Sequence, residues 1–156
     1  MVCKWLMEDL HTITMTVVMN TYIFETFDIG LSESFEVQIT EEMIHQFRLL
    51  SGDENPMHID KQYAQEHGYE SKLVYGMLTA SFYSKLAGMY LPGQYCILKS
   101  VESFFERPVY VGDTLKITGK VKEKDDRFFQ ATVKAKITNQ DGKTVSKANI
   151  LVGFYE

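Results

Sequence analysis

Residues 76–93, GMLTASFYSKLAGMYLPG, form the segment that most constrains how this chain can fold. Lys85 is the only charged residue between Met77 and Leu91. At helical spacing, one face would carry large apolar residues and nearly the opposite face small ones: Leu78, Phe82, Leu86 and Met89 on the first, and Ala80, Ser84 and Gly88 on the second. A helix that is apolar or small all round is normally buried. We therefore expect this helix to lie at the centre of the domain.

Beyond Tyr95 the hydrophobic pattern changes to the period of two that is typical of strands. Apolar and polar residues alternate through 115–122 and 129–137, and a last alternating stretch covers 148–154. The segment KDDR and the pair Asp141-Gly142 are typical of hairpin connections. Strands with one apolar and one polar face favour an antiparallel sheet. In all we expect four strands after the helix.

The residues before the helix contain a strand and two shorter helices. FEVQI, at 35–39, alternates as a strand should, and Thr40 is placed to cap a helix that ends near Gly52. Asp60 would cap a second, short helix that Gly68 closes. The order predicts an α+β domain in which an antiparallel sheet wraps around a long central helix, the "hot dog" arrangement. A ferredoxin-like fold fits less well, because its second helix would come between later strands.

The first two dozen residues do not follow this pattern, so we expect an N-terminal extension (1–24) before a single hot-dog domain (25–156). Glu8, Asp9 and His11 interrupt any apolar run, so the segment is neither a convincing signal peptide nor a membrane span. The stretch from Thr12 to Val18 would form an extra strand in one interpretation. In the other, which we favour, the first eighteen residues are dispensable and Met19 is the functional start.

Charge and cysteine content exclude some classes of function. The net charge is −5 and the pI is near 5.4, so a broad electrostatic surface for nucleic acid is not expected. Cys3 and Cys96 form neither a disulfide framework nor a zinc-ligand cluster, which predicts reduced thiols in a cytoplasmic protein. No acidic cluster has the spacing of a metal cage.

The stretch SGDENPMH, at 51–58, carries the strongest candidates for chemistry. Five residues separate Asp53 from His58 through a proline turn, which could place both side chains around one water molecule as an acid/base pair. An Asx-type turn beside a surface histidine explains the spacing equally well, because Asp and Asn before Pro are common turn formers. Spacing alone therefore leaves both interpretations open.

Two residues of the buried helix are further candidates. Gly76 opens the helix, where N–H groups without intrahelical partners could stabilise a carbonyl oxygen that gains negative charge. Removing one donor of that kind costs about 2.7–4 kcal/mol of barrier. The alternative is that Gly76 only permits a tight entry to the helix. Ser84 would either allow the helix to pack closely on the sheet or orient one member of the Asp53/His58 pair; no nucleophile elbow surrounds it.

Lysines alternate with the apolar residues of the predicted sheet: Lys116, Lys120, Lys122, Lys134 and Lys136. We interpret them as a solvated face that also discourages edge-to-edge aggregation, with phosphate binding as the alternative.

Three segments in order, LSGDENPMHID, VYGMLTASFYSKL and SFFERPVYVGDTL, resemble the MaoC-like (R)-specific enoyl-CoA hydratases, with their D-x-N-P-x-H motif. The likeness extends from Phe27 to the C-terminus. It implies a homodimer, or a dimer of dimers, that adds water to an enoyl thioester of CoA or acyl-carrier protein, with no cofactor, no metal and no membrane or nucleic-acid partner. One departure is visible: Tyr75 stands where the family usually has histidine, which we interpret as altered pocket lining.

Carried over by position, the resemblance makes Asp53 and His58 the catalytic acid/base pair and the Gly76 N–H the oxyanion donor. Asn55 would brace their loop, and Ser84 matches a serine near the pair. Two rival functions remain. A hot-dog thioesterase would need only one carboxylate, which the paired Asp53 and His58 argue against. The other is a non-catalytic acyl-thioester-binding protein, for example a sensor. The sensor is disfavoured because the N-terminal extension is short and not basic, whereas a DNA-binding segment would be basic.

Overall fold

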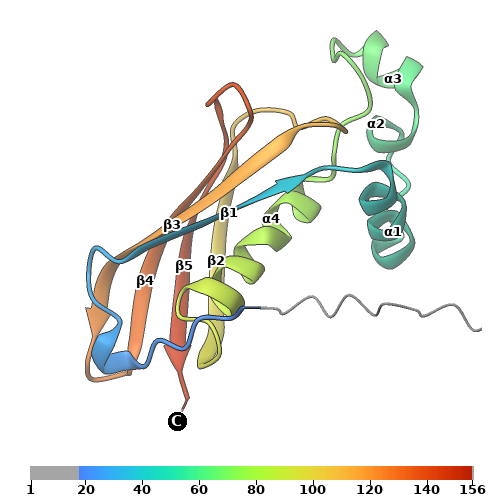
Figure 1. The fold of residues 1–156 in the computed structure, drawn as a ribbon. Coiled ribbons are helices and arrows are strands. Elements are labelled where there is room, and N and C mark those ends of the chain that lie inside the picture. The colour runs from blue at the N-terminus through green and yellow to red at the C-terminus, as the bar shows by residue number, and fades with distance from the viewer. Residues whose placement is uncertain (1–17, 156) are drawn as a thin grey trace, which may run out of the picture.

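The computed structural model describes residues 18–155, which form one antiparallel sheet, a central helix and a group of short helices (Figure 1). The strands are β1 (Ser32–Gln38), β2 (Cys96–Phe105), β3 (Thr114–Asp125), β4 (Gln130–Thr138) and β5 (Thr144–Phe154). Their order across the sheet is β1-β3-β4-β5-β2, and every neighbouring pair is antiparallel. The α+β prediction and the four strands after the helix are confirmed.

The central helix α4 (Gly76–Lys85) lies across one face of the sheet, as the hot-dog arrangement requires (Figure 1). Its inner residues join the sheet's buried positions in one hydrophobic core, with Tyr83 and, just beyond the end of α4, Leu86 fully buried. Most strand residues of this core are those that the alternation predicted, among them Leu115, Ile117, Val121, Val133, Ala135, Ile137, Ile150 and Val152. Val145 of β5 is a core residue outside the predicted stretch, whereas Phe129, the first residue of the predicted 129–137 stretch, precedes β4 and is 51% exposed. The inferred central position of the helix is therefore confirmed.

Two details of that helix differ from the expectation. The α-helix ends at Lys85 and continues as one π-helical turn, η2 (Leu86–Tyr90), in which the Leu91 N–H bonds to the Leu86 carbonyl at 2.8 Å. The helix is also not buried all round, because Met77 is 64% exposed and Ser84 faces solvent. The expectation that Ser84 packs between helix and sheet is wrong: the inward positions are Leu78, Thr79, Ala80 and Tyr83.

The helices before α4 are α1 (Glu41–Ser51), α2 (Pro56–Ile59) and α3 (Lys61–Glu66), grouped beyond one end of the sheet near the start of α4 (Figure 1). The predicted caps are confirmed: Thr40 Oγ1 accepts from the Met43 N–H at 3.3 Å, and Gly52 ends α1 with a φ of 69°. Asp60 caps α3 through the Tyr63 N–H at 3.1 Å. Helix α2 was not predicted; Pro56 opens it.

Residues 20–31 lead into the sheet along the far end of α4. The Asn20 N–H bonds to the Met89 carbonyl at 2.9 Å, and Thr21 forms an isolated bridge with Gly93. The short 3₁₀ turn η1 (Phe24–Thr26) and Phe27 are anchored by aromatic contacts with Phe154, with ring centroids 5.2–5.3 Å apart. Most of the proposed extra strand, 12–17, lies outside the described residues.

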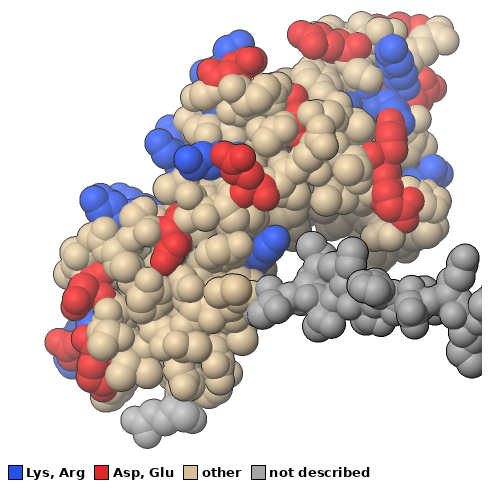
Figure 2. Space-filling view, viewed as in Figure 1, with Lys and Arg blue, Asp and Glu red and all other residues tan. Residues whose placement is uncertain are grey.

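The outer face of the sheet is basic. The five lysines of the predicted solvated face are exposed, and basic side chains are visible along the left margin of the view over the sheet (Figure 2). Lys134 lies directly opposite Lys120 in the β3–β4 pairing. Within residues 18–155, no helix has the length and apolar character needed to cross a membrane.

One buried hydrogen bond joins α4 to the sheet and allows a test of this packing. Tyr83 Oη donates to Ser146 Oγ at 2.9 Å, and both side chains are fully buried. We expect Tyr83→Phe to lower the free energy of unfolding by about 1–3 kcal/mol, because it leaves the Ser146 hydroxyl buried without this partner. Adding Ser146→Ala should restore part of the loss, as measured by urea unfolding.

The exposed Tyr155, whose hydroxyl donates to the Gln94 carbonyl at 2.6 Å, provides the control. Tyr155→Phe should change the free energy of unfolding by less than about 0.5 kcal/mol. Additive losses from Tyr83→Phe and Ser146→Ala would contradict the coupling.

Candidate active site

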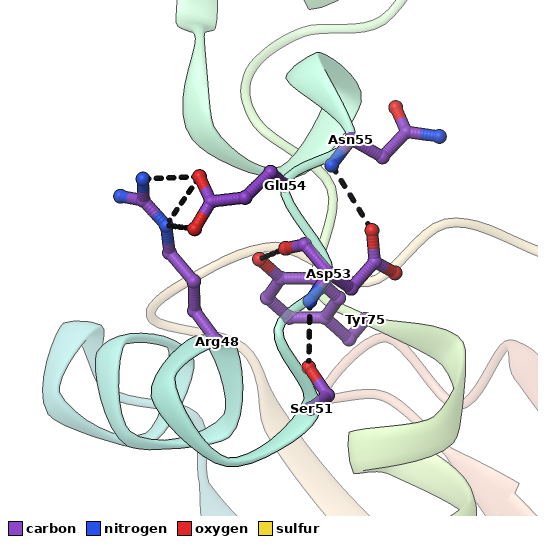
Figure 3. Close-up of polar contacts among 6 residues, drawn as sticks. All are labelled: Arg48, Ser51, Asp53, Glu54, Asn55 and Tyr75. Carbon is purple, nitrogen blue, oxygen red and sulfur yellow. Dashed lines mark hydrogen bonds and ion pairs between the residues drawn. The ribbon is translucent and has the colours of Figure 1, made fainter.

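The DENP segment between α1 and α2 is an ordered turn built from its own side chains (Figure 3). Ser51 Oγ accepts from the Asp53 N–H at 3.2 Å, and Asp53 Oδ1 accepts from the Asn55 N–H at 3.0 Å. Asn55 Oδ1 then accepts from the Met57 N–H at 3.0 Å, which caps α2. The Asx-type turn considered in the sequence therefore exists, and α2 follows it directly to carry His58.

His58 is held in a defined orientation by the chain segment before α4. Its Nδ1 lies 2.8 Å from the carbonyl oxygen of Leu73. Because a carbonyl oxygen can only accept, Nδ1 must carry the proton of this bond. In the neutral ring Nε2 is then the unprotonated nitrogen. His58 is thus set up to accept a proton at Nε2.

A groove of about 360 Å³ joins His58 to the start of the central helix. It is lined by residues from three places: His58 and Tyr69 near the short helices, Leu73, Val74, Gly76 and Thr79 around the start of α4, and Phe105, Glu106, Arg107, Pro108, Val109 and Val145 at the ends of β2 and β5. The Val74 N–H bonds to the Val109 carbonyl at 2.9 Å, which ties two of these walls together. One groove therefore contains both a proton acceptor and a helix N-terminus.

Gly76 opens α4 at the wall formed by Phe105. A Cβ added at this position would lie 3.3–3.4 Å from three atoms of the Phe105 ring, which is tighter than most Cβ contacts and would require the ring to shift slightly. The absence of a side chain keeps the first turn of α4 accessible, and N–H groups there lack intrahelical partners and carry the positive end of the helix dipole. An oxygen that gains negative charge could be stabilised at this position.

The other predicted site residues lie outside the groove lining. Asp53 is exposed, in the turn that leads to α2, and Asn55 caps that helix. Tyr75 is only 2% exposed and lies behind His58, with the two ring centroids 4.0 Å apart. Ser84 lies on the exposed side of the last turn of α4. Within one copy of residues 18–155, the groove brings together His58 and Gly76 but not Ser84.

Sequence reasoning assigned no role to two features of the site. Phe105 and Arg107 line the groove. They lie in SFFERPVYVGDTL, the third segment that carries the family resemblance, but neither was assigned a role from the sequence. Arg48 also forms an ion pair with Glu54, with Nε 2.9 and 3.0 Å from the two carboxylate oxygens (Figure 3). Their separation of six residues matches no helical pair, so only the turn after α1 brings them together.

Comparison with known proteins shows which family this architecture belongs to. The family described as "MaoC like domain" matches residues 27–143, and the chain belongs to it. An (R)-specific enoyl-CoA hydratase of Rhodospirillum rubrum is 36% identical over 115 residues, covering 71% of this chain and 80% of that protein. An (R)-specific enoyl-CoA hydratase of Aeromonas caviae is 30% identical over 118 residues, covering 76% and 88% of the two chains. The family predicted from the three motifs is confirmed.

Solved structures confirm the hot-dog fold class. The unliganded R-hydratase PhaJ1 from Pseudomonas aeruginosa matches with a TM-score of 0.81 and 29% identity, over 89% of this chain and 88% of that one. The (R)-hydratase from A. caviae involved in PHA biosynthesis matches with a TM-score of 0.78 and 29% identity, over 82% and 97% of the chains.

The Arg48–Glu54 ion pair gives a pH-dependent prediction. Arg48 holds the pKa of the Glu54 carboxyl below its ordinary value of 4.5. A carboxyl whose pKa is lower in the folded state stabilises that state above its ordinary pKa and loses the contribution as pH falls through the lower folded value. We expect Glu54→Gln to be slightly less stable than wild type at pH 7, and this difference to shrink as pH falls below 4.5 and through the lower folded value, as measured by urea unfolding.

Glu66 provides the matched control, because it is exposed and accepts a hydrogen bond from Gln62 at 2.9 Å. For Glu66→Gln, we do not expect the difference from wild type in the free energy of unfolding to disappear at low pH. A Glu54→Gln difference that persists unchanged at low pH would mean that the ion pair is not its cause.

Proposed function

We propose that this protein is an (R)-specific enoyl thioester hydratase, a hydro-lyase that reversibly adds water to a trans-2-enoyl thioester of CoA or acyl-carrier protein. The product would be the (R)-3-hydroxyacyl thioester. The observation that carries the proposal is the groove that His58, with its Nδ1 bonded to the Leu73 carbonyl, lines together with Gly76 and Thr79 of the first turn of α4. The names of the two bacterial relatives support the same reaction.

The reaction has three parts, and different site residues can assist each of them. The oxygen of a water molecule bonds to C3, a proton is delivered to C2, and the electrons of the C2–C3 double bond pass transiently toward the thioester oxygen. In the proposal Asp53 and His58 hold the water, remove its proton and return a proton to C2. The Gly76 N–H and the helix dipole stabilise the enolate-like oxygen.

Two rival functions predict different results. A hot-dog thioesterase would cleave the thioester and release a thiol, and a non-catalytic acyl-thioester-binding protein would bind without turnover. The Nδ1–H bond of His58 to Leu73 favours hydration over both, because it leaves Nε2 as a proton acceptor on a residue that lines the groove. A thioesterase that relies on one carboxylate has no need of this arrangement.

Crotonyl-CoA provides the test of the reaction. We expect the purified full chain to bleach the conjugated-enoyl absorbance without releasing free thiol. Asp53→Asn and His58→Ala should each lower kcat by about 100-fold to 10,000-fold while the fold is kept, because each removes one proton-transfer group.

His67 offers a matched control for the histidine variant. Its Nδ1 is likewise hydrogen-bonded to a backbone carbonyl, that of Tyr63 at 2.7 Å, but it lies outside the groove lining. His67→Ala should therefore leave kcat unchanged. Thiol release would favour the thioesterase, and near-normal rates in both Asp53→Asn and His58→Ala would refute the site assignment.

We further propose that the protein forms a homodimer, alone or as part of a dimer of dimers. Strand β2 is an edge of the sheet, and large apolar residues along it are exposed: Ile97 44%, Leu98 40%, Phe104 54% and Phe105 50%. Exposed apolar edge strands are unusual in soluble monomers because they invite pairing. Pairing of two β2 edges would cover these residues beside the groove.

The dimer is tested by sedimentation. We expect the wild type to have twice the chain mass of 18.0 kDa, or four times in the dimer of dimers. Leu98→Lys should shift the mass toward the monomer, because it would bury a charge at the β2 edge. Leu50 on α1, which is 84% exposed, provides the control, and Leu50→Lys should not shift the mass. A monomeric wild type would refute the proposal.

A cytoplasmic location and a role in fatty-acid metabolism complete the proposal. The cysteine pattern supports that location, and burial raises the pKa of the Cys96 thiol to about 11, so this thiol stays protonated.

A further inference from the structure

Tyr75 immediately precedes α4 and contacts both halves of the motif turn. Its hydroxyl donates a hydrogen bond to the backbone carbonyl oxygen of Asp53 at 2.8 Å, and its ring packs against that of His58 in a tilted arrangement, with centroids 4.0 Å apart and planes at 33°. Phe47 of α1 packs against Tyr75 as well, at 5.2 Å. Figure 3 shows Tyr75 reaching the Asp53 backbone from the start of α4. A single buried side chain thus bridges the two residues assigned to proton transfer.

The contact with Asp53 matters because the rest of this turn is fixed locally. Asp53 is exposed, and its bonds to Ser51 and Asn55 each span two residues. The bond from Tyr75 spans 22 residues and ties the turn to the core. Local bonds define the shape of a turn, whereas a bond to the core defines where that turn lies relative to the groove.

The contact with His58 acts on the imidazole ring. A histidine ring can rotate about its last side-chain bond, and the Nδ1–H bond to Leu73 exists in only one orientation. The Tyr75 ring covers one face of the imidazole and limits this rotation. Leu73 and Tyr75 belong to the same short segment, so the hydrogen bond and the ring contact act together on His58.

We propose that Tyr75 is a positioning residue that keeps the side chains of Asp53 and His58 at a fixed separation. Its hydroxyl holds the turn that carries Asp53, and its ring holds the imidazole of His58. This inference rests on the proposed hydratase function. Two groups that share one water must keep their separation closely, since a displacement of about 1 Å can cost 100-fold in rate. From the sequence we interpreted Tyr75 as altered pocket lining, and the present proposal gives it a positioning role instead.

The hydroxyl remains a donor under working conditions. Burial, with a smaller contribution from the charge of Asp53, raises the pKa of the Tyr75 phenol above its ordinary value of 10.0. The phenol therefore keeps its proton throughout the neutral range, and its bond to the Asp53 carbonyl does not depend on pH there.

Two substitutions separate the two contacts. Tyr75→Phe removes only the hydroxyl, and we expect kcat to fall about tenfold with KM changed less than about threefold. Tyr75→Leu also removes the ring, and we expect kcat to fall about 100-fold with a similarly small change in KM. A residue that selected the acyl chain would instead change KM with chain length.

Tyr63 offers the matched control. Its ring stacks on that of His67, with centroids 4.2 Å apart and planes at 29°, and neither residue lines the groove. Tyr63→Phe and Tyr63→Leu should leave kcat within about twofold of wild type.

NMR provides readouts that do not need activity. In wild type the His58 side-chain nitrogens should report a proton on Nδ1, and in Tyr75→Leu a mixture of both tautomers. In Tyr75→Phe the Asn55 amide hydrogen, which bonds to Asp53 Oδ1, should exchange several times faster than in wild type. The Tyr63 variants should change neither signal.

These readouts keep the two hypotheses apart. A wild type without hydratase activity refutes the proposed function, and the two NMR signals then decide the positioning role by themselves. If Tyr75→Leu does not fold, Tyr75→Phe decides. Wild-type kcat and unchanged Asn55 exchange in Tyr75→Phe, or an unchanged His58 tautomer in a folded Tyr75→Leu, overturns the positioning role.

Discussion

The packing of α4 against the inner face of the sheet is the constraint on which the rest of the molecule depends. The helix supplies buried residues such as Leu78 and Tyr83 to a core that the sheet completes with alternate residues of β3, β4 and β5. Because α4 is fixed along its length, its first residue is fixed too. Gly76 is thereby held at one end of the sheet, against Phe105 of β2. The groove is a consequence of where the helix begins.

The segment just before α4 transmits this position to the chemistry. Leu73 accepts the His58 bond, Val74 donates to Val109, and Tyr75 contacts both His58 and Asp53. Leu73 and Tyr75 therefore connect the start of α4 to α2 and its exposed turn, while Val74 between them ties the segment to Val109. A short helix such as α2 has little stability of its own, so its place depends on contacts of this kind. In metal sites, residues behind a ligand orient it through hydrogen bonds. Leu73 and Tyr75 would orient His58 in the same way, although no metal is involved in the proposal.

How much could be predicted depended on whether a feature is local. Alternation in β3, β4 and β5 and the Thr40 and Asp60 caps each follow from a few adjacent residues, and all were predicted. The Asx turn at Asp53 is equally local, and it was one of the two interpretations that spacing left open. The family resemblance supplied what spacing left open, namely a reaction for Asp53 and His58.

What could not be predicted required a view of residues distant in sequence. The inward face of α4 was misjudged because small residues at Ala80 and Ser84 fit a buried or an exposed helix face equally well, and only the sheet decides between them. The π-helical turn after Lys85 is a choice between hydrogen-bond partners that differ by one residue. Tyr75 was interpreted as pocket lining because nothing in its neighbourhood indicates a bond to a carbonyl 22 residues away.

The exposed side of α4, which includes Ser84, lies on the same helix that begins at the groove. Met77 and Ser84 are exposed on the same helix that places Gly76 beside Phe105 of the exposed β2 edge. The uncovered side of α4 and the unpaired edge therefore adjoin the groove. In the proposed homodimer, pairing at β2 would cover apolar residues that now face water and would narrow the open side of the groove. Water exclusion strengthens every electrostatic contact in a site, so the stability of the dimer and the strength of the oxyanion site at Gly76 would have the same origin.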